Sequence, residues 1–343
     1  MQITGELKDD KIIVKKPKDV GRLYNKSHFG KIISENKLQL DLLEGVFLLD
    51  EGKIKIFINK EEIDFQKLVE IATKNISDFE INYLTFKDLR KRGHSVKISK
   101  DNKYSFNDFH KHFVVIVFSE RDILKLNETK KILIETKNKN KELWFAIVDE
   151  EGDITYYNVS IFDMKGNIKK HNFKKATGYI LNDRIVIFDK NKSKALFEKE
   201  FFGKPFGEGI QLSFIEALYL LDNKILEIHN IDREKITKSK LQKILIEKNQ
   251  DFNLKNKAFT DLKNRGLIVK TGFKFGAHFR AYSNSPDKTH AEYLVHVVNK
   301  DFNSIWSEIS RAVRLAHSVN KEIIFARTHE RNIDYIKLGR LRP

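Results

Sequence analysis

The stretch LQLDLLEGVFLLD at residues 38–50 returns as IQLSFIEALYLLD at residues 210–222, with six identities in thirteen positions. Three more pairs match in the same order: FKDLRKRG (86–93) with FTDLKNRG (259–266), HKHFVVIVF (110–118) with HAEYLVHVV (290–298), and NKELWFA (140–146) with NKEIIFA (320–326). Ordered matches at nearly constant spacing indicate an internal duplication. We therefore interpret the chain as two copies of one unit, residues 1–175 and 176–343.

Hydrophobic periodicity gives the same outline for each unit. A short hairpin is followed by a helix that carries Leu40, Leu43 and Phe47 on one face, and by a second helix that ends at a glycine. A strand, a helix and a closing hairpin complete the unit. This order predicts an α+β or mixed α/β fold, in which a small α+β domain precedes a mixed-sheet domain, twice over. The predicted subdomains are about 1–82, 83–175, 176–255 and 256–343.

The composition favours an intracellular protein with a polyanionic partner. The chain contains no cysteine, so thiol catalysis, disulfides and cysteine-bound zinc are excluded. No signal peptide is visible and no apolar run approaches the ~18 residues of a membrane span, so we expect a cytoplasmic protein. The net charge of +16 favours phosphate backbones, although lysine-rich surfaces also occur without such a role.

The two copies differ in one loop. The spacing between equivalent residues grows from 173 at Gly266 to 180 at His290, so the second copy holds seven extra residues there. We expect this insertion to include the neighbourhood of Tyr282, a residue that we place in a polar loop and whose counterpart at constant spacing is Asn102. An added loop on a duplicated frame is a candidate site, although surface loops also drift neutrally.

The copies also differ in charge. Arg314 and Arg340 stand where the first copy has Ile134 and Ser160. Conversely, the first copy carries an acidic hairpin loop that the second copy lacks, formed by Asp149, Glu150, Glu151 and Asp153. The copies are therefore interpreted as specialised.

Tyr282, His290 and Lys321 offer the side chains for RNA cleavage without metal, in which the 2′-hydroxyl of the substrate is the nucleophile. Histidine can hold or yield a proton near neutral pH, and lysine can stabilise a charged phosphorane. Tyrosine is a weak base unless cations stand nearby. The first copy keeps His110 and Lys141 but not this tyrosine.

Motifs for metals and cofactors are missing from the sequence. Pro286 and Asp287 resemble the start of a restriction-type nuclease signature, but no acid between residues 287 and 343 is followed two places on by lysine. There is no H-E-x-x-H, Walker loop or G-x-G-x-x-G. We expect no metal and no cofactor.

Taken together, KFGAHFRAY, HAEYLVHVV and ISRAVRLAHSVNKEIIFA resemble the catalytic domain of archaeal tRNA-splicing endonucleases. The tandem arrangement resembles the two-repeat homodimeric form of that family, in which the first repeat is degenerate and non-catalytic. The resemblance implies a nuclease-like second domain and excision of introns from precursor tRNA at bulge-helix-bulge sites. The implied products are 2′,3′-cyclic phosphate and 5′-hydroxyl ends, formed without metal.

The same resemblance assigns roles. Tyr282 would be the general base, His290 the general acid, and Lys321 the group that stabilises the transition state. Arg314 and Arg340 would clamp an extruded base between their guanidinium planes, with Arg342 or Lys337 as substitutes for Arg340.

The acidic loop would dock on a cationic surface of a catalytic unit, and the hydrophobic closing strands WFAIV and YIKL would supply the remaining pairing surface. This gives a homodimer with four units and two active sites. The alternative for that loop is a solvated hairpin tip without a docking role. For the whole chain the alternatives are a non-catalytic RNA-binding subunit of such a complex, a metal-dependent DNA nuclease, and a basic scaffold protein.

Overall fold

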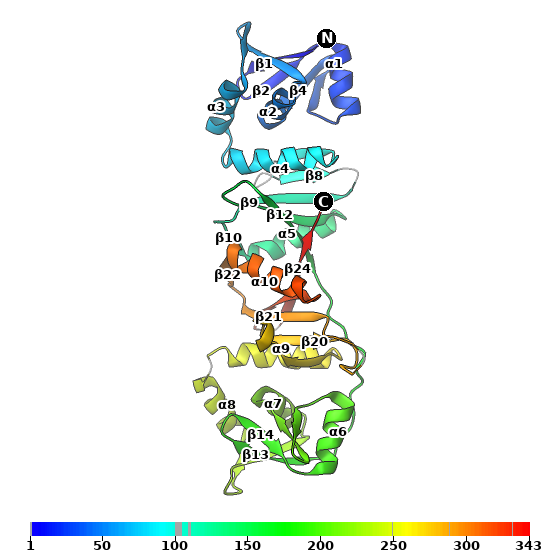
Figure 1. The fold of residues 1–343 in the computed structure, drawn as a ribbon, viewed down its shortest axis with the longest axis vertical. Helices are drawn as coiled ribbons and strands as arrows, with labels where there is room; N and C mark the ends of the chain where they lie inside the picture. The colour runs from blue at the N-terminus through cyan, green and yellow to red at the C-terminus, as the bar shows by residue number, and fades with distance from the viewer. Residues whose placement is uncertain (1, 100–104, 109–110, 249, 288, 331) are drawn as a thin grey trace. The chain divides into compact units, whose positions relative to one another are not determined.

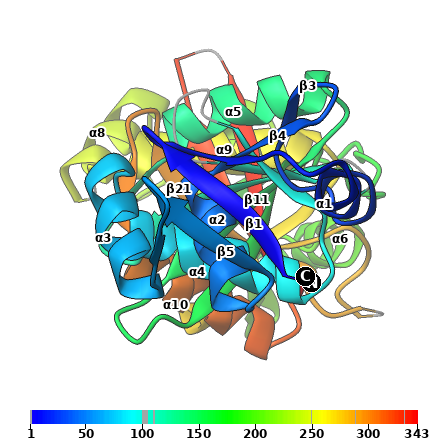
Figure 2. The ribbon, with the colours of Figure 1, turned by 90° about the horizontal axis from the view of Figure 1, so that it is seen from above.

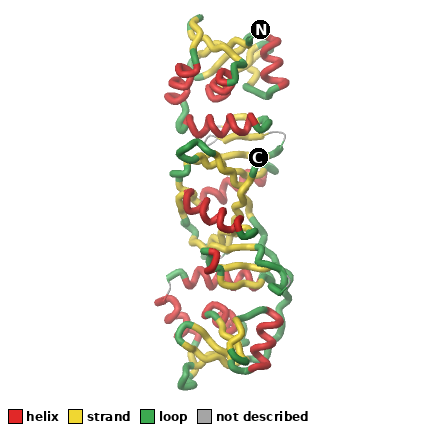
Figure 3. Tube along the Cα trace, viewed as in Figure 1, coloured by secondary structure: helices red, strands yellow, loops and turns green. Residues whose placement is uncertain are grey.

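The computed structural model of the chain describes residues 2–99, 105–108, 111–248, 250–287, 289–330 and 332–343. It contains two compact units. The first consists of Met1–Ser160, Asn303–Ser310 and Gly339–Pro343, and the second of Ile161–Phe302 and Arg311–Leu338. Both units mix helices and strands, as Figure 3 shows in red and yellow. Among the helices that the structure describes, none combines the length and apolar composition that a membrane crossing needs.

The first unit begins with a sheet of strand order β3-β4-β2-β1-β5-β6. Its strands are β1 (Ile3–Lys8), β2 (Lys11–Val14), β3 (Lys31–Ser34), β4 (Lys37–Asp41), β5 (Ile54–Ile58) and β6 (Glu61–Ile63). The helical elements of this part are α1 (Pro17–Gly21), the π-helical turn η1 (Arg22–Lys26), α2 (Leu42–Asp50), α3 (Phe65–Asn75) and α4 (Phe79–Lys91). Figure 2 shows α2 behind β1 and β5, and all its residues except the last two are buried.

The first unit continues with strands in the order β12-β11-β9-β8-β7. Their bounds are β7 (Val96–Ser99), β8 (Ser105–Asp108), β9 (Phe113–Ser119), β11 (Glu142–Val148) and β12 (Ile154–Ile161). α4 contacts β9 and α5 (Leu126–Asn138) contacts β11, so helices cover the central strands (Figure 1). This explains why β9 reads as an unbroken apolar run rather than an alternating one.

The second unit repeats the first sheet in the order β15-β16-β14-β13-β17-β18. Its strands are β13 (Ala176–Leu181), β14 (Arg184–Ile187), β15 (Lys204–Phe206), β16 (Gly209–Leu212), β17 (Leu226–His229) and β18 (Lys235–Ile236). Its helices are α6 (Lys190–Glu200), α7 (Phe214–Asp222), α8 (Lys238–Lys248) and α9 (Phe252–Asn264). Strand by strand, this order matches that of the first unit.

The later strands of the second half follow the order β19-β20-β21-β23-β24, which again matches its counterpart. The elements are β19 (Ile268–Thr271), the 3₁₀ turn η2 (Phe273–Phe275), β20 (Phe279–Tyr282), β21 (Tyr293–Asn299), α10 (Trp306–Ser318), β23 (Glu322–Thr328) and β24 (Ile333–Leu341). The mixed fold and the tandem duplication predicted from the sequence are thus confirmed.

One predicted helix begins later than expected. Leu40, placed on a helix face by its periodicity, lies in β4, and α2 begins at Leu42. The reason is a capping box: Asp41 accepts a hydrogen bond from the helix, while Glu44 accepts one from the Asp41 backbone. Ser213 and Glu216 form the same capping box at the start of α7.

A segment of the second sequence copy completes the first unit. β22 (Asn303–Ile305) pairs with β10 (Ile123–Lys125). The next residue, Trp306, is fully buried and lies 5.3 Å from Phe118 and 5.8 Å from both Phe145 and Tyr157 between ring centroids. The core of the first unit therefore depends on residues from near the end of the chain.

Candidate active site

One sheet edge in the second unit collects the three residues that the sequence analysis assigns to chemistry. β21 and β23 are parallel, with Tyr293 opposite Glu322, and β20 is antiparallel to β21, with Ala281 opposite Tyr293. Parallel strands begin at the same edge, where an antiparallel neighbour ends. Tyr282 at the end of β20, His290 before β21 and Lys321 before β23 consequently leave the sheet at one edge.

Tyr282 does not lie in a polar loop, as its sequence context suggested. It is the last residue of β20, opposite Ile268 of β19. Its side chain is 7% exposed and packs with Ile268 and Ala291. The strand forms because Phe279 and Ala281 are buried while β19 and β21 supply hydrogen bonds on both sides. Packing of this kind holds the phenol ring in a fixed place.

Arg280 is a site residue that the sequence analysis missed. Its guanidinium carbon lies 5.8 Å from the ring centroid of Tyr282, because residues two apart on a strand share a face. Its Nε is buried and has no hydrogen-bond partner among the described residues. The signal was present in FRAY, where an arginine stands two places before the tyrosine.

His290 is exposed and follows a loop that closes on itself. The backbone N–H of Ser283 donates to Oε2 of Glu292 at 2.9 Å, and that of Thr289 donates to the Ser285 carbonyl at 3.1 Å. These bonds return the chain to the edge at which it left β20. His290 is therefore presented to solvent beside the end of that strand.

Lys321 is half-buried at the turn between α10 and β23. Its backbone N–H donates to the Ala316 carbonyl at 2.9 Å, and its Nζ donates to the Val319 carbonyl at 3.1 Å. Nζ also lies 5.3 Å from the ring centroid of Phe275. The Glu322 backbone N–H donates to the Glu292 carbonyl at 2.9 Å, which ties this turn to the approach to β21.

The two candidate clamp residues differ in setting. Arg314 is exposed on α10, seven residues before Lys321. Arg340 is exposed near the end of β24, within Gly339–Pro343 of the first unit. The possible substitute Lys337 donates to Glu322 at 2.9 Å, so its charge is engaged.

The strand register locates the insertion. Asp108 lies opposite Phe113 in the first unit, and Ala281 lies opposite Tyr293 in the second. Phe113 and Tyr293 are equivalent residues, so Asp108 corresponds to Ala281. The seven extra residues therefore follow Tyr282, as residues 283–289.

The sequence position after Asp108 is Phe109, which becomes the counterpart of Tyr282 in place of Asn102. Phe109, Asn102, Tyr104 and His110 all lie outside the described residues, so the comparison rests on register and sequence. A phenylalanine at this position lacks the hydroxyl that a general base needs.

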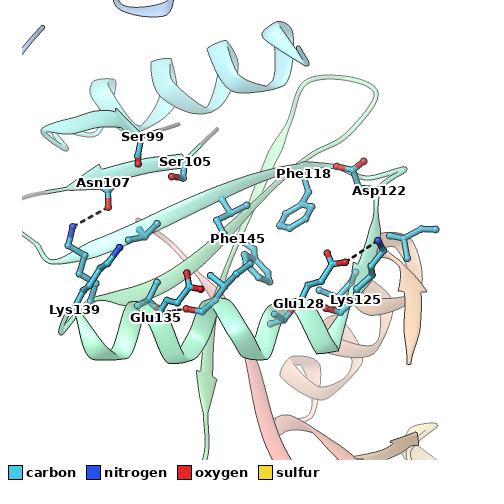
Figure 4. A pocket seen from close by; sticks show the side chains of 18 of the residues that line it. Ser99, Ser105, Asn107, Phe118, Asp122, Lys125, Glu128, Glu135, Lys139 and Phe145 are labelled. Atoms are coloured by element: carbon cyan, nitrogen blue, oxygen red, sulfur yellow. Dashed lines mark hydrogen bonds and ion pairs between the residues drawn. The ribbon is translucent and has the colours of Figure 1, made fainter. Parts of the chain in front are cut away.

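The first unit has a cavity of about 870 Å³ between α5 and its sheet (Figure 4). Nζ of Lys141, the counterpart of Lys321, donates to Oδ1 of Asn107 at 3.1 Å on its wall. Asn107 holds the register position of Arg280. The lysine of the first copy thus has an amide neighbour where the second copy has a guanidinium group.

Family models match both halves of the chain. The model for the N-terminal domain of tRNA intron endonuclease matches residues 3–69 and 176–241. The model for its catalytic C-terminal domain matches residues 79–156 and 252–335. The chain belongs to the tRNA intron endonuclease family. The resemblance seen in the sequence is thereby confirmed.

Full-length relatives carry the same family name. A tRNA-splicing endonuclease from Methanococcoides burtonii is 37% identical over 351 residues, covering 98% of this chain and 99% of the relative. One from Methanosarcina barkeri is 33% identical and covers 98% of both. A tRNA-splicing endonuclease from Hyperthermus butylicus is 32% identical over 176 residues, which are 48% of this chain and 97% of that protein.

Membership in the tRNA intron endonuclease family settles the broad activity. The chain is an endonuclease of tRNA splicing, an enzyme that cleaves RNA, and its substrate class is tRNA. The half-length relative agrees with the duplication, because one half of this chain corresponds to nearly the whole of that protein.

Proposed function

We propose that this chain excises introns from precursor tRNA by metal-independent cleavage at bulge-helix-bulge sites, leaving 2′,3′-cyclic phosphate and 5′-hydroxyl ends. The observation that carries the proposal is the meeting of Tyr282, His290 and Lys321 at one edge of the second-unit sheet. A base, an acid and a fixed cation are what an attack by the 2′-hydroxyl on the adjacent phosphate requires.

In this mechanism Tyr282 removes the proton of the 2′-hydroxyl, and the 2′-oxygen attacks phosphorus. Arg280 contacts the ring of Tyr282, with its guanidinium carbon 5.8 Å from the ring centroid. The bond from phosphorus to the 5′-oxygen breaks, and His290 gives its proton to that leaving oxygen. Lys321 stabilises the negative charge on the phosphorane oxygens, because its position is fixed by backbone carbonyls and the turn before β23.

Substrate recognition rests on shape and stacking. We assign Arg314 and Arg340 to an extruded bulge base, since a planar guanidinium group stacks on a base face. Both side chains are exposed. Proteins read RNA chiefly through unpaired bases and helix shape, which suits a bulge-helix-bulge substrate.

The acidic loop of the first unit, Asp149–Asp153, has a fixed shape that suits docking. Oδ1 of Asp149 accepts hydrogen bonds from the backbone N–H groups of Glu151 at 3.0 Å and Asp153 at 2.9 Å. Glu150 forms an ion pair with Arg121. Asp149 therefore holds the turn, while the carboxylates of Glu151 and Asp153 are exposed at its tip.

The second unit offers a cavity of matching charge, which we call the cationic cavity. It measures about 720 Å³. The cationic side chains that line it are Arg184, Lys204, Lys255, Lys270, Lys274 and Arg280. Of the described residues on its wall, only Glu216 carries a carboxylate. We assign this cavity to the acidic loop of a second copy, which gives a homodimer with two active sites.

The experiment that tests the reaction is cleavage of a bulge-helix-bulge RNA in excess EDTA, with the product ends mapped, for the wild type and His290→Ala. Cyclic phosphate and 5′-hydroxyl ends that disappear in the variant are the expected result. Cleavage only after Mg²⁺ is added would favour a metal-dependent nuclease. RNA binding without cleavage in any buffer would favour a non-catalytic subunit, and an unimpaired variant would remove His290 from the mechanism.

A further inference from the structure

The cationic cavity has a counterpart in the first unit, which we call the first-unit cavity. It measures about 520 Å³. Both cavities are built on a buried glutamate at the start of a helix. The Gly30 backbone N–H donates to Glu44 at 2.8 Å in the first unit, and that of Gly203 donates to Glu216 at 2.9 Å in the second.

A lysine occupies the same place in both cavities. Nζ of Lys97 donates to the Gly30 carbonyl at 3.4 Å, and Nζ of Lys270 donates to the Gly203 carbonyl at 2.8 Å. The chain thus contains two cavities of similar construction, so only a chemical difference between them can direct the acidic loop to one of the two.

The helix N-caps give the cavities different charge. In the first unit Lys11 lies opposite Asp41, and its Nζ is 3.2 Å from Oδ2 of Asp41. In the second unit Ile185 lies opposite Leu212, so the same register brings Arg184 opposite Ser213. Ser213 is uncharged, and its hydroxyl donates to Glu216 at 2.8 Å. Lys11, one of three lysines that line the first-unit cavity, is thus paired with a carboxylate whose counterpart in the cationic cavity is an uncharged serine.

Further positions strengthen the difference. At the spacing of 173 residues, Lys255 and Arg280 of the cationic cavity correspond to Asn82 and Asn107. Burial raises the pKa of Glu44, whereas the pKa of Glu216, which burial alone would raise, is lowered, chiefly by Lys270. The surroundings of Glu216 are therefore the more positive of the two.

We infer that Ser213 and Asp41 decide which of the two cavities accepts the acidic loop of a second copy. The inference rests on the docking proposed above and names its selectivity residues. A carboxylate at the N-cap repels the loop, and a serine at the same place admits it. Entry into one cavity alone gives a closed dimer, whereas entry into both would permit open chains of molecules.

The test is the dimer dissociation constant of the full chain by sedimentation equilibrium, for wild type and Ser213→Asp. Aspartate already serves as N-cap in the same capping box at position 41, so the exchange is compatible with the helix start. The dissociation constant is expected to rise by about tenfold or more, because the new carboxylate repels Glu151 and Asp153 of the acidic loop. Ser213→Asn, which caps without charge, is expected to keep the wild-type constant.

Two further variants separate the possible failures. Asp41→Ser removes the carboxylate from the first-unit cavity and is expected to give assemblies larger than the dimer at high protein concentration, because the loop can then enter both cavities. A purely dimeric Asp41→Ser variant would overturn the assignment of Asp41. If Glu151→Gln with Asp153→Asn dimerises as tightly as wild type, the docking itself is wrong. If that double variant is weakened while Ser213→Asp is not, or if Ser213→Asn is weakened equally, only the selectivity inference is overturned.

Discussion

At the scale of single residues, the two repeats differ by one hydroxyl group at the position of the proposed general base. The register makes Phe109 the counterpart of Tyr282. We therefore predict that Tyr282→Phe loses cleavage by about 10²- to 10⁴-fold, the usual contribution of a general base. The ring packing against Ile268 and Ala291 should survive, so RNA affinity is expected to stay unchanged.

Single-turnover cleavage and a filter-binding constant, measured in parallel, check this prediction. Tyr293→Phe is the matched control, because Tyr293 lies on β21 in contact with Phe162 and outside the proposed chemistry. A Tyr282→Phe enzyme that cleaves at the wild-type rate would assign the base to another group.

Arg280 gives a second prediction. Arg280→Met should lower the single-turnover rate about tenfold with little change in KM, because the guanidinium group contacts the ring of the proposed base Tyr282 and helps to position it. Arg280→Lys should restore part of the rate. Since Arg280 also lines the cationic cavity, the assay is run at a protein concentration at which sedimentation shows the variant to be dimeric. A loss confined to KM would move Arg280 from the chemistry to binding.

The sequence located Lys321 directly before its strand, whereas His290 is separated from β21 by Ala291 and Glu292, because the strand begins only at Tyr293. It could not locate Arg280 beside Tyr282. The pairing of β20 with both β19 and β21 fixes that contact, and a four-residue strand with an arginine inside carries a weak pattern.

At the scale of elements, β21 carries a histidine that limits acid stability. Burial, with a smaller contribution from His278, lowers the pKa of His296 to about 4. The unfolded chain binds this proton near pH 6.5 and the folded chain does not. The contribution of His296 to the free energy of unfolding is therefore fully present above pH 6.5. About 3 kcal/mol of it is lost as the pH falls toward 4.

Urea unfolding between pH 7 and pH 4 for wild type and His296→Gln checks this expectation. The variant should start less stable, because it loses the ring contact with Phe325, and should lose less stability on acidification. His317→Gln, an exposed position on α10, should follow the wild-type curve. Parallel curves for wild type and His296→Gln would contradict the assignment.

Strands and helices were predictable from the sequence where the pattern was long, as in β9 and β23. The start of α2 was not, because an apolar residue of β4 continues the helical period by chance. Only the capping box at Asp41 separates the two elements.

At the scale of the whole molecule, the duplication was predictable from ordered sequence matches. The assignment of Asn303–Ser310 to the first unit was not, because it depends on the pairing of β10 with β22 and on one tryptophan. Sequence order alone puts that segment in the second copy.

Trp306 provides the prediction at this scale. Trp306→Ala should destabilise the first unit by about 3–5 kcal/mol, because a fully buried indole among Phe118, Phe145 and Tyr157 is removed. Chemical denaturation followed by circular dichroism measures the loss. Leu315→Ala on the same helix removes a side chain that is 42% exposed and should cost far less. Equal losses for the two variants would show that Trp306 does not anchor the first unit.

The dependence of the first unit on Asn303–Ser310 and Gly339–Pro343 has a consequence for biosynthesis. A nascent chain emerges from the ribosome in order, and domains ordinarily fold as they appear. Here the first unit cannot complete its core until Asn303–Ser310 and Gly339–Pro343 have been synthesised. During that interval Trp306 is not yet present to pack against Phe118 and Phe145, and β22 is not yet present to pair with β10. A translation product that stops before Asn303 would therefore leave Phe118 and Phe145 exposed, and such an apolar surface favours aggregation.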